Sequence, residues 1–197
     1  RELMETARLP AVTQHDIDPP QQPQDRLVQL EFIHEIKARL GADGTMRHKV
    51  DSTEVTRLAN WYEAQGISVV AVSLLHSYLD PKQEKEVAAI FASVTPEIDV
   101  VLSSDVLPEL REYERTLATC LNASLMPGMK QHVERVIEEQ ELSGTPFLIM
   151  KSSGGLSTAD SVVKKPLTTA LSGPSAAVVG MAWLGNKIGF KDLITLD

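Results

Sequence analysis

Two runs near the end of the chain decide the fold: Leu171-Ser-Gly-Pro-Ser-Ala-Ala-Val-Val-Gly180 and Leu193-Ile-Thr-Leu-Asp197. In the first run, Ser172 is predicted to cap a helix over residues 174–188, because a Ser side chain can accept a hydrogen bond from the first helical turn. Pro174 suits that turn, since its missing N–H would have no partner there. The remaining N–H groups of such a helix start favour a phosphate.

The second run predicts a short strand followed by a metal ligand. Residues 193–196 are mostly apolar, which is typical of a buried strand. Asp197 then lies at the carboxyl end of that strand, where the metal of a nucleotide is often held. Gly173 allows a sharp turn at the start of the helix predicted over residues 174–188. Small residues lie along one face of that helix.

Upstream, predicted helices and strands alternate. A helix over residues 51–65 is indicated by an apolar stripe made of Val55, Leu58, Ala59 and Tyr62. Another helix over 81–94, preceded by Asp80 as its cap, carries a second stripe made of Val87, Ile90, Phe91 and Val94. Apolar strands are predicted at 67–75 and 98–102. This β-α-β order indicates an α/β fold with a parallel or mixed sheet and right-handed crossovers.

Weaker signals predict the remaining elements. A hairpin is expected between residues 28–36 and 46–50, with Gly44 in the turn. A helix over 109–125 should bury an apolar stripe, and Pro127 should end it before a second helix over 129–142. That stripe consists of Leu110, Tyr113, Leu117 and Leu121. The last predicted elements are strands at 147–150 and 167–170 and a short helix at 159–163.

Polar residues at predicted strand ends are candidates for function. His76 follows the strand at 67–75, and ligands of open α/β sheets bind at that edge, although a His there can also serve only to satisfy backbone groups. Arg115 follows Arg111 by four residues, so the pair could hold an anion or could form a solvated face. Gly154 and Gly155 follow another strand and could turn tightly around an anion or form a plain turn.

Composition excludes several classes of protein. The net charge of −8 argues against a nucleic-acid or basic membrane-binding surface. No apolar run reaches the roughly 20 residues needed to span a bilayer. The single cysteine, Cys120, permits no internal disulfide and fits a reducing compartment such as the cytoplasm. The sequence also lacks a Gly-x-Ser-x-Gly motif and a Walker loop.

Four motifs in order resemble the hydantoinase A / 5-oxoprolinase family. They are Ser73-Leu-Leu-His-Ser-Tyr78, Glu112-Tyr-Glu-Arg-Thr116, Ser152-Ser-Gly-Gly-Leu156 and, counted together as one motif, the runs at residues 171–180 and 193–197. The resemblance covers residues 27–197. It implies part of an actin-like (ribonuclease H-like) ATPase fold. It also implies ATP-dependent opening of a cyclic amide, such as a hydantoin or 5-oxoproline, after phosphorylation of the amide oxygen.

The resemblance also implies a set of site residues and partners. ATP and Mg²⁺ are the expected cofactors, with Asp197 as the metal ligand and nucleotide contacts from Ser172, Gly173, Gly154 and Gly155. Arg115 and His76 are the catalytic candidates, with substrate or interdomain contacts as their alternative role. The expected partners are a small cyclic amide and a second hydantoinase-type subunit.

The same resemblance predicts a domain division and leaves alternatives open. Residues 1–26 are expected to form an extended linker or the end of a preceding segment, 27–104 an α/β unit that ends the N-terminal family region, and 105–197 the start of the hydantoinase A domain. The family's Asp-x-Gly-Gly-Thr phosphate loops are missing, so the chain is expected to be an interior fragment that is inactive alone. The alternatives are a subunit of an ATP-dependent ketone carboxylase and a non-catalytic α/β binding module.

Overall fold

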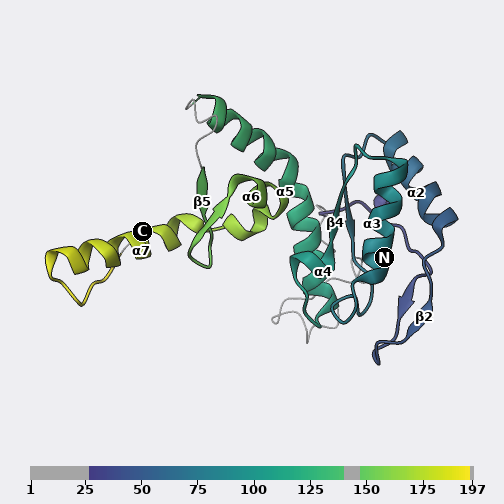
Figure 1. Ribbon diagram of the computed structural model, residues 1–197, viewed down its shortest axis with the longest axis horizontal. Helices are drawn as coiled ribbons and strands as arrows, with labels where there is room; N and C mark the ends of the chain where they lie inside the picture. Colours follow the sequence, from purple (N-terminus) through teal and green to yellow (C-terminus); the bar gives the residue numbers. More distant parts are fainter. Residues whose placement is uncertain (1–26, 140–146, 196–197) are drawn as a thin grey trace, which may run out of the picture. The chain divides into compact units, whose positions relative to one another are not determined.

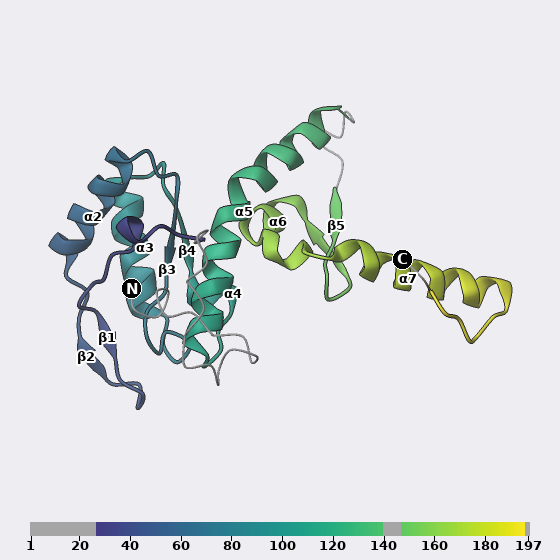
Figure 2. The same ribbon diagram turned by 180° about the vertical axis from the view of Figure 1, so that it is seen from behind.

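The structure, a computed structural model, describes residues 27–139 and 147–195, and the chain divides into two compact units. The first unit extends to Ala123 and the second begins at Ser124. Figures 1 and 2 show the elements of both units from opposite sides. Asp197 lies outside the described residues, as does the predicted linker over residues 1–26.

A parallel strand pair forms the centre of the first unit. β3 (Val69–Val72) pairs with β4 (Asp99–Leu102) in parallel, and α3 (Lys82–Val94) connects them. The predicted β-α-β unit is therefore confirmed, although within the described residues this sheet contains only two strands. α2 (Ser52–Ala64) and α3 cover one face of the pair, and the first turns of α5 lie on the other (Figures 1 and 2).

The core of the first unit consists of the predicted helix stripes packed on the strands. Asp51 caps α2, because its side chain accepts hydrogen bonds from the N–H groups of Thr53 and Glu54. Gly66, with φ 71°, adopts the left-handed conformation that ends many helices. The buried cluster contains Val55, Leu58, Ala59, Tyr62, Val70, Val72, Val87, Phe91, Ile98 and Leu102. Both predicted helices and their apolar faces are thus confirmed.

The segment before α2 differs from the prediction. Residues 28–36 contain a 3-10 helix, η1 (Leu30–Phe32), and no strand. The hairpin forms instead between β1 (Arg39–Leu40) and β2 (Met46–His48), with Gly44 at φ 76° in its turn as predicted. The physical reason is tertiary: the hydroxyl of Tyr62 donates to the carbonyl of Phe32 over 2.8 Å and draws this segment onto α2.

The helix after β4 is longer than predicted and buries a different face. A short helix, α4 (Ser103–Val106), follows β4, and α5 then runs over Glu112–Glu139 without a break at Pro127. Its buried residues in the first unit are polar as well as apolar: Arg115, Thr119, Asn122 and Ala123. Leu110, predicted to be in the core, precedes the helix and is 61% exposed. Arg115 can be buried on this polar face because the carbonyls of Leu74 and Glu109 accept its hydrogen bonds.

Within the described residues, the second unit combines the end of α5 with a hairpin, two short helical elements and one longer helix. β5 (Leu148–Met150) pairs antiparallel with β6 (Leu156–Thr158), a strand that the sequence did not predict. α6 (Ala159–Lys164) confirms the short helix. The predicted strand at 167–170 is wrong, because η2 (Pro166–Thr169) occupies it: Pro166 starts a turn and has no N–H for a strand ladder.

The organising helix of the second unit is present with a different start. α7 (Ser172–Ile188) begins at Ser172, so the prediction that Ser172 caps the helix is wrong. Leu171 precedes the helix in a left-handed conformation, with φ 61°, and offers no side-chain cap. Of the predicted last strand, residues 193–195 are described and form no strand, and residue 196 lies outside the described part.

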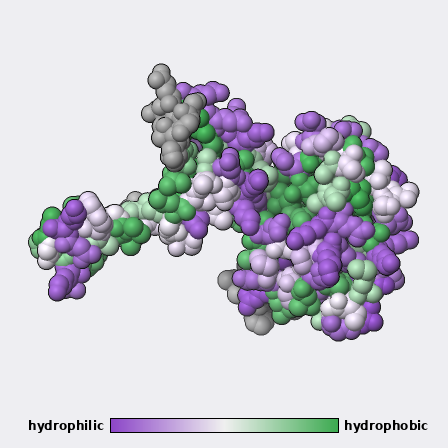
Figure 3. Space-filling view, viewed as in Figure 1, coloured by the Kyte–Doolittle hydropathy of each residue, from purple (hydrophilic) through white to green (hydrophobic). Residues whose placement is uncertain are grey.

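Apolar side chains cover much of α7 and the residues after it. Figure 3 shows hydrophobic residues along this helix on the face in view. The exposed ones include Val178, Val179, Met181, Trp183, Leu184, Ile188, Phe190 and Ile194. Among the described residues, no helix combines the length and the hydropathy required to cross a membrane.

Candidate functional site

His76 lies in a strained turn at the carboxyl end of β3. The N–H of Ser77 donates to the carbonyl of Leu74 over 3.3 Å, which makes His76 the third residue of the turn. Its φ of 63° is the value that Gly or Asn usually adopts at this position of a type II turn. A left-handed backbone costs a residue with a side chain about 1–2 kcal/mol, so neighbouring contacts must hold it.

The buried carboxylate of Glu84 supports this turn from α3. One of its oxygens accepts from the N–H of Leu74 over 2.8 Å and from the hydroxyl of Ser103 over 2.6 Å. The other oxygen accepts from the N–H of Ser104 over 2.9 Å. Glu84 is 0% exposed, so these three donors replace the water that an ionised carboxylate requires. It therefore joins the ends of β3 and β4 through one side chain.

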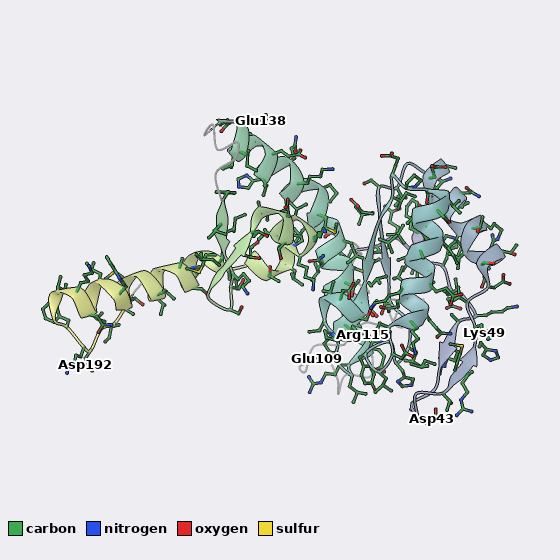
Figure 4. All side chains as sticks on the ribbon, viewed as in Figure 1. Asp43, Lys49, Glu109, Arg115, Glu138 and Asp192 are labelled. Atoms are coloured by element: carbon green, nitrogen blue, oxygen red, sulfur yellow. The ribbon has the colours of Figure 1, made fainter. Side chains whose placement is uncertain are left out.

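Arg115 supports the same turn from α5. Its guanidinium donates to the carbonyl of Leu74 over 2.8 Å and to the carbonyl of Glu109 over 2.9 Å, and Figure 4 labels Arg115 and Glu109 beside each other. The guanidinium also lies 5.6 Å from the ring centre of Tyr78, within range of a cation–π contact. Arg115 is 1% exposed whereas Arg111 is exposed, so the two do not form the shared anion-binding face that the sequence allowed.

Several polar atoms near this turn lack a hydrogen-bond partner. Within the part of the chain that the structure describes, these buried atoms include Nδ1 of His76, Oγ of Ser104 and Nε of Arg115. The ring of His76 lies 6.1 Å from that of Tyr78, so His76 and Arg115 approach Tyr78 together. Imidazole can accept or donate a proton near neutral pH. These buried polar atoms make this edge of the sheet the candidate site of the first unit.

The glycine turn and the start of α7 come together within the second unit. Gly154 and Gly155 have φ of 83° and 76°, which a tight turn between β5 and β6 requires. The hydroxyl of Ser175 donates to the carbonyl of Ser152 over 2.5 Å, and Ser152 in turn donates to the carbonyls of Thr168 and Ala170. These contacts join the turn, η2 and the first turn of α7.

Some backbone N–H groups of the glycine turn already donate to carbonyls of the chain and cannot bind a ligand. The N–H of Gly154 donates to the carbonyl of Lys151, and that of Ser152 donates to the carbonyl of Thr168. The start of α7 has no side-chain cap, and a Cβ added at Gly173 would meet nothing within 4 Å. Since the first N–H groups of a helix have no partner inside it, Ser172 and Gly173 are better placed than the glycine turn to meet an anion.

Neither Cys120 nor a cluster of metal-binding side chains provides a second candidate site among the described residues. Burial raises the pKa of Cys120 to about 11, so its thiol is protonated at neutral pH. Among the described residues, no group of three His, Cys, Asp or Glu side chains could hold a metal ion. The backbone N–H of Lys82 lowers the pKa of Asp80 by hydrogen bonding to its carboxylate at the start of α3.

Sequence reasoning missed Glu84 and the two serines it binds. A signal was available: Glu84 lies on the same helix face as Val87 and Phe91, at spacings of three and seven residues. A charged residue within an apolar stripe must find partners when it is buried. Ser103 and Ser104 offered no such signal, because they look like ordinary polar residues after a strand.

Two regions of one family match this chain. The N-terminal region of hydantoinase/oxoprolinase matches residues 3–95, and hydantoinase/oxoprolinase itself matches residues 115–197. The chain belongs to the hydantoinase/oxoprolinase family. The resemblance carried by the four sequence motifs is thereby confirmed.

Relatives of this chain occur in archaea, bacteria and plants. An uncharacterised protein of Methanocaldococcus jannaschii is 30% identical over 87% of this chain and 25% of its own length. The caprolactamase subunit alpha of Pseudomonas jessenii is 26% identical over 93% of this chain and 27% of its own length. 5-Oxoprolinase 1 of Arabidopsis thaliana is 34% identical over 59% of this chain and 9% of its own length. The chain thus spans about a quarter of the first two relatives.

Two solved structures share this fold. The ATP-dependent caprolactamase of Pseudomonas jessenii superposes with a TM-score of 0.71 at 27% identity, over 78% of this chain and 23% of that chain. Nucleotide-free acetone carboxylase superposes with a TM-score of 0.64 at 27% identity, over 78% of this chain and 22% of that chain. The mixed α/β architecture is therefore shared with both an amide hydrolase and a carboxylase.

Proposed function

We propose that this chain forms part of an ATP-dependent hydrolase that opens a cyclic amide such as a lactam or hydantoin. The observation that carries the proposal is the structural similarity to ATP-dependent caprolactamase over 78% of the chain. ATP would supply the phosphoryl group that makes the amide carbon electrophilic. Family regions over 27–104 and 105–197, within an actin-like ATPase fold, are part of the same proposal.

Ser172 and Gly173 are the residues that would hold a phosphate of the nucleotide. They begin the 17-residue helix α7, where no side chain caps the backbone N–H groups. The absence of a Cβ at Gly173 lets an anion approach the backbone. Gly154 and Gly155 would shape the adjoining turn. Asp197 stays a predicted Mg²⁺ ligand outside the described residues.

His76 and Arg115 would serve the amide substrate from the first unit. His76 would bind a substrate oxygen or nitrogen through its imidazole, whose buried Nδ1 has no partner among the described residues. Arg115 would keep the turn that carries His76 in place, since its guanidinium is bound to backbone carbonyls. A second hydantoinase-type subunit is the proposed partner, and the relative from Pseudomonas jessenii is itself named as a subunit. The cytoplasmic location stays a prediction.

The test of this proposal is ATP-dependent ring opening by the complete protein with its partner subunit. Caprolactam, 5-oxoproline and hydantoin would each be supplied with ATP and Mg²⁺, and ring-opened product would be measured beside ADP. We expect one of them to yield product in a fixed ratio to ADP. ADP release that no cyclic amide stimulates would contradict the proposal.

Variants of α7 test the phosphate contact. Gly173→Glu adds a negative charge at the helix start and should raise the KM for ATP about tenfold or more, since an anion would meet a carboxylate. Gly180→Glu is the matched control, because it lies two turns along the same helix and a Cβ there also meets nothing within 4 Å. Equal KM values for the two variants would remove the helix start from the ATP site.

A ketone carboxylase subunit is the second candidate, favoured by the similarity to acetone carboxylase. The same assay would separate it, because a carboxylase requires bicarbonate and a ketone for product formation. ATP hydrolysis that depends on acetone or acetophenone with bicarbonate, and not on a cyclic amide, would select the carboxylase. An absence of any ATP-dependent turnover would favour a non-catalytic binding module.

A further inference from the structure

We propose that Glu84 and Arg115 are positioning residues that hold His76 in its left-handed turn, so that the imidazole can bind a polar substrate group at the carboxyl edge of β3 and β4. The identity of that substrate rests on the proposed function. The holding role rests on contacts within the first unit alone.

Glu84 and Arg115 both form hydrogen bonds to the backbone of Leu74, one to its N–H and the other to its carbonyl. Glu84 accepts from the N–H of Leu74 over 2.8 Å, and Arg115 donates to its carbonyl over 2.8 Å. We call these three residues the Leu74 clamp. That carbonyl also accepts the 3.3 Å hydrogen bond from Ser77 that closes the turn around His76. The clamp therefore holds the first residue of the turn in which His76 is third.

The clamp is built from elements that approach the turn independently. Glu84 comes from α3 and also binds Ser103 and Ser104 after β4, while Arg115 comes from α5. Both side chains are almost completely buried. Charged groups buried in this way are costly to place and are usually committed to specific partners. Here both are committed to the same peptide segment, which indicates that its conformation matters.

The residue being held has a side chain that makes the left-handed turn costly. Gly or Asn would occupy φ 63° with less strain than His76. Strained backbone persists at functional sites when the surrounding structure fixes it. The half-buried imidazole keeps Nδ1 without a partner among the residues described, and its neighbour Tyr78 contacts the guanidinium of Arg115. The side chain of His76 is thus retained for a contact that the described chain does not itself provide.

The first experiment measures the reactivity of His76 and needs no catalysis. The complete protein would be treated with diethylpyrocarbonate, and modification of His76 would be followed by peptide mass spectrometry. Glu84→Gln replaces one accepting oxygen with an NH₂ group, which can only donate and therefore loses the hydrogen bonds from its present donors. The turn should loosen, and the rate at which His76 is modified should rise about threefold or more. Arg115→Lys, which loses the paired donors, should act in the same direction.

Asp80→Asn is the matched control for this experiment. Asp80 supports the start of the same helix, because its carboxylate accepts from the N–H of Lys82 over 3.0 Å and lies 3.3 Å from the Lys82 ammonium. The substitution should leave the reactivity of His76 unchanged. Equal rates in the wild type, Glu84→Gln and Arg115→Lys would overturn the clamp, whatever the reaction of the complete protein proves to be.

The second experiment separates stability from activity. His76→Gly should raise the unfolding temperature, because glycine relieves the left-handed strain, and should lower kcat/KM for the substrate about tenfold or more. An equally active His76→Gly variant would overturn the proposed substrate contact.

A double-mutant cycle tests whether Glu84 acts through His76. If it does, Glu84→Gln should lower kcat/KM in the wild type and have little further effect in the His76→Gly background. Independent losses that multiply in the double variant would overturn the positioning role. If Glu84→Gln fails to fold, the same cycle with Arg115→Lys decides the question.

Discussion

The two compact units bury their apolar residues to very different extents. The first unit packs α2 and α3 on the β3–β4 pair around ten buried residues that form one cluster. In the second unit, the most deeply buried apolar residues of the described part are few, with Val133 and Val162 the clearest examples. Trp183 on α7 is 62% exposed, and its neighbours along the helix are exposed too.

This contrast teaches where each unit obtains its stability. A closed core stabilises the first unit from within, because each buried side chain is removed from water. A helix with apolar residues on several faces is typical of one that packs against more surface than a single hairpin provides. The strained residues reflect the same difference: His76 is held by buried charged groups, whereas Leu171 is 81% exposed.

Matched truncations of aromatic residues should have the largest difference in effect. Phe91→Ala in the first unit should lower the free energy of unfolding by about 3–5 kcal/mol, since it leaves a cavity in the core. Trp183→Ala should change it by less than about 0.5 kcal/mol, because the ring is largely exposed. Urea unfolding of this chain measures both values. A large loss for Trp183→Ala would show that α7 is covered in solution.

Pro127→Ala tests the helix that extends from one unit into the other. Because Pro127 lies inside α5, the substitution should stabilise the chain by up to about 3 kcal/mol, the helix propensity difference between Pro and Ala. The measurement is the urea midpoint, with Ala118→Gly as a variant that should act in the opposite direction on the same helix. No stabilisation would favour the break at Pro127 that the sequence predicted.

Tyr62→Phe probes the contact that draws the N-terminal segment onto the first unit. Loss of the hydrogen bond to Phe32 should cost about 1 kcal/mol. Burial raises the pKa of Tyr62 to about 12 from 10.0, so the folded state binds its proton more tightly than the unfolded state. This contribution is complete below pH 10 and is lost as the pH rises toward about 12.

The contribution of Tyr62 to the pH dependence of stability is isolated by comparing the wild type with Tyr62→Phe. The wild type should lose stability more steeply than Tyr62→Phe as the pH rises above 10.0. Tyr113→Phe serves as the control for a tyrosine outside this contact. Parallel stability curves for wild type and Tyr62→Phe would mean that the hydroxyl is equally hydrated in the folded and unfolded states.

Leu171→Gly should have the smallest effect and sharpens the comparison with His76. Relief of the left-handed backbone should stabilise the chain by about 0.5–1 kcal/mol, after the greater flexibility of glycine in the unfolded state is subtracted. Thermal unfolding measures this shift, with Leu156→Gly as a control at a residue in β6 with ordinary φ. Destabilisation by Leu171→Gly would indicate that the leucine side chain packs against a surface.

Much of the first unit could be predicted from the sequence because its signals are local. The apolar stripes of α2 and α3 recur at helical spacing, Asp51 marks a cap, and the intervening strand is apolar throughout. The same locality placed His76 at a strand end. Four short motifs were enough to identify the family, because their order along the chain is specific.

Tertiary contacts decided the remaining features, since the competing signals were of similar strength. Pro127 lowers helix propensity but does not interrupt α5, and Pro166 begins a 3-10 helix where apolar residues suggested a strand. The face of α5 that carries Arg115 is buried because the carbonyls of Leu74 and Glu109 accept hydrogen bonds from its guanidinium. No periodicity in the sequence encodes those partners.

The sequence by itself determined the family, the β-α-β unit and the positions of most candidate residues. Only the tertiary structure revealed that Glu84 and Arg115 meet on the backbone of Leu74 and that His76 is strained. The reason is physical: hydrophobic periodicity is a property of neighbours along the chain. Hydrogen bonds of buried charges depend instead on residues that are distant in sequence and become close only after folding.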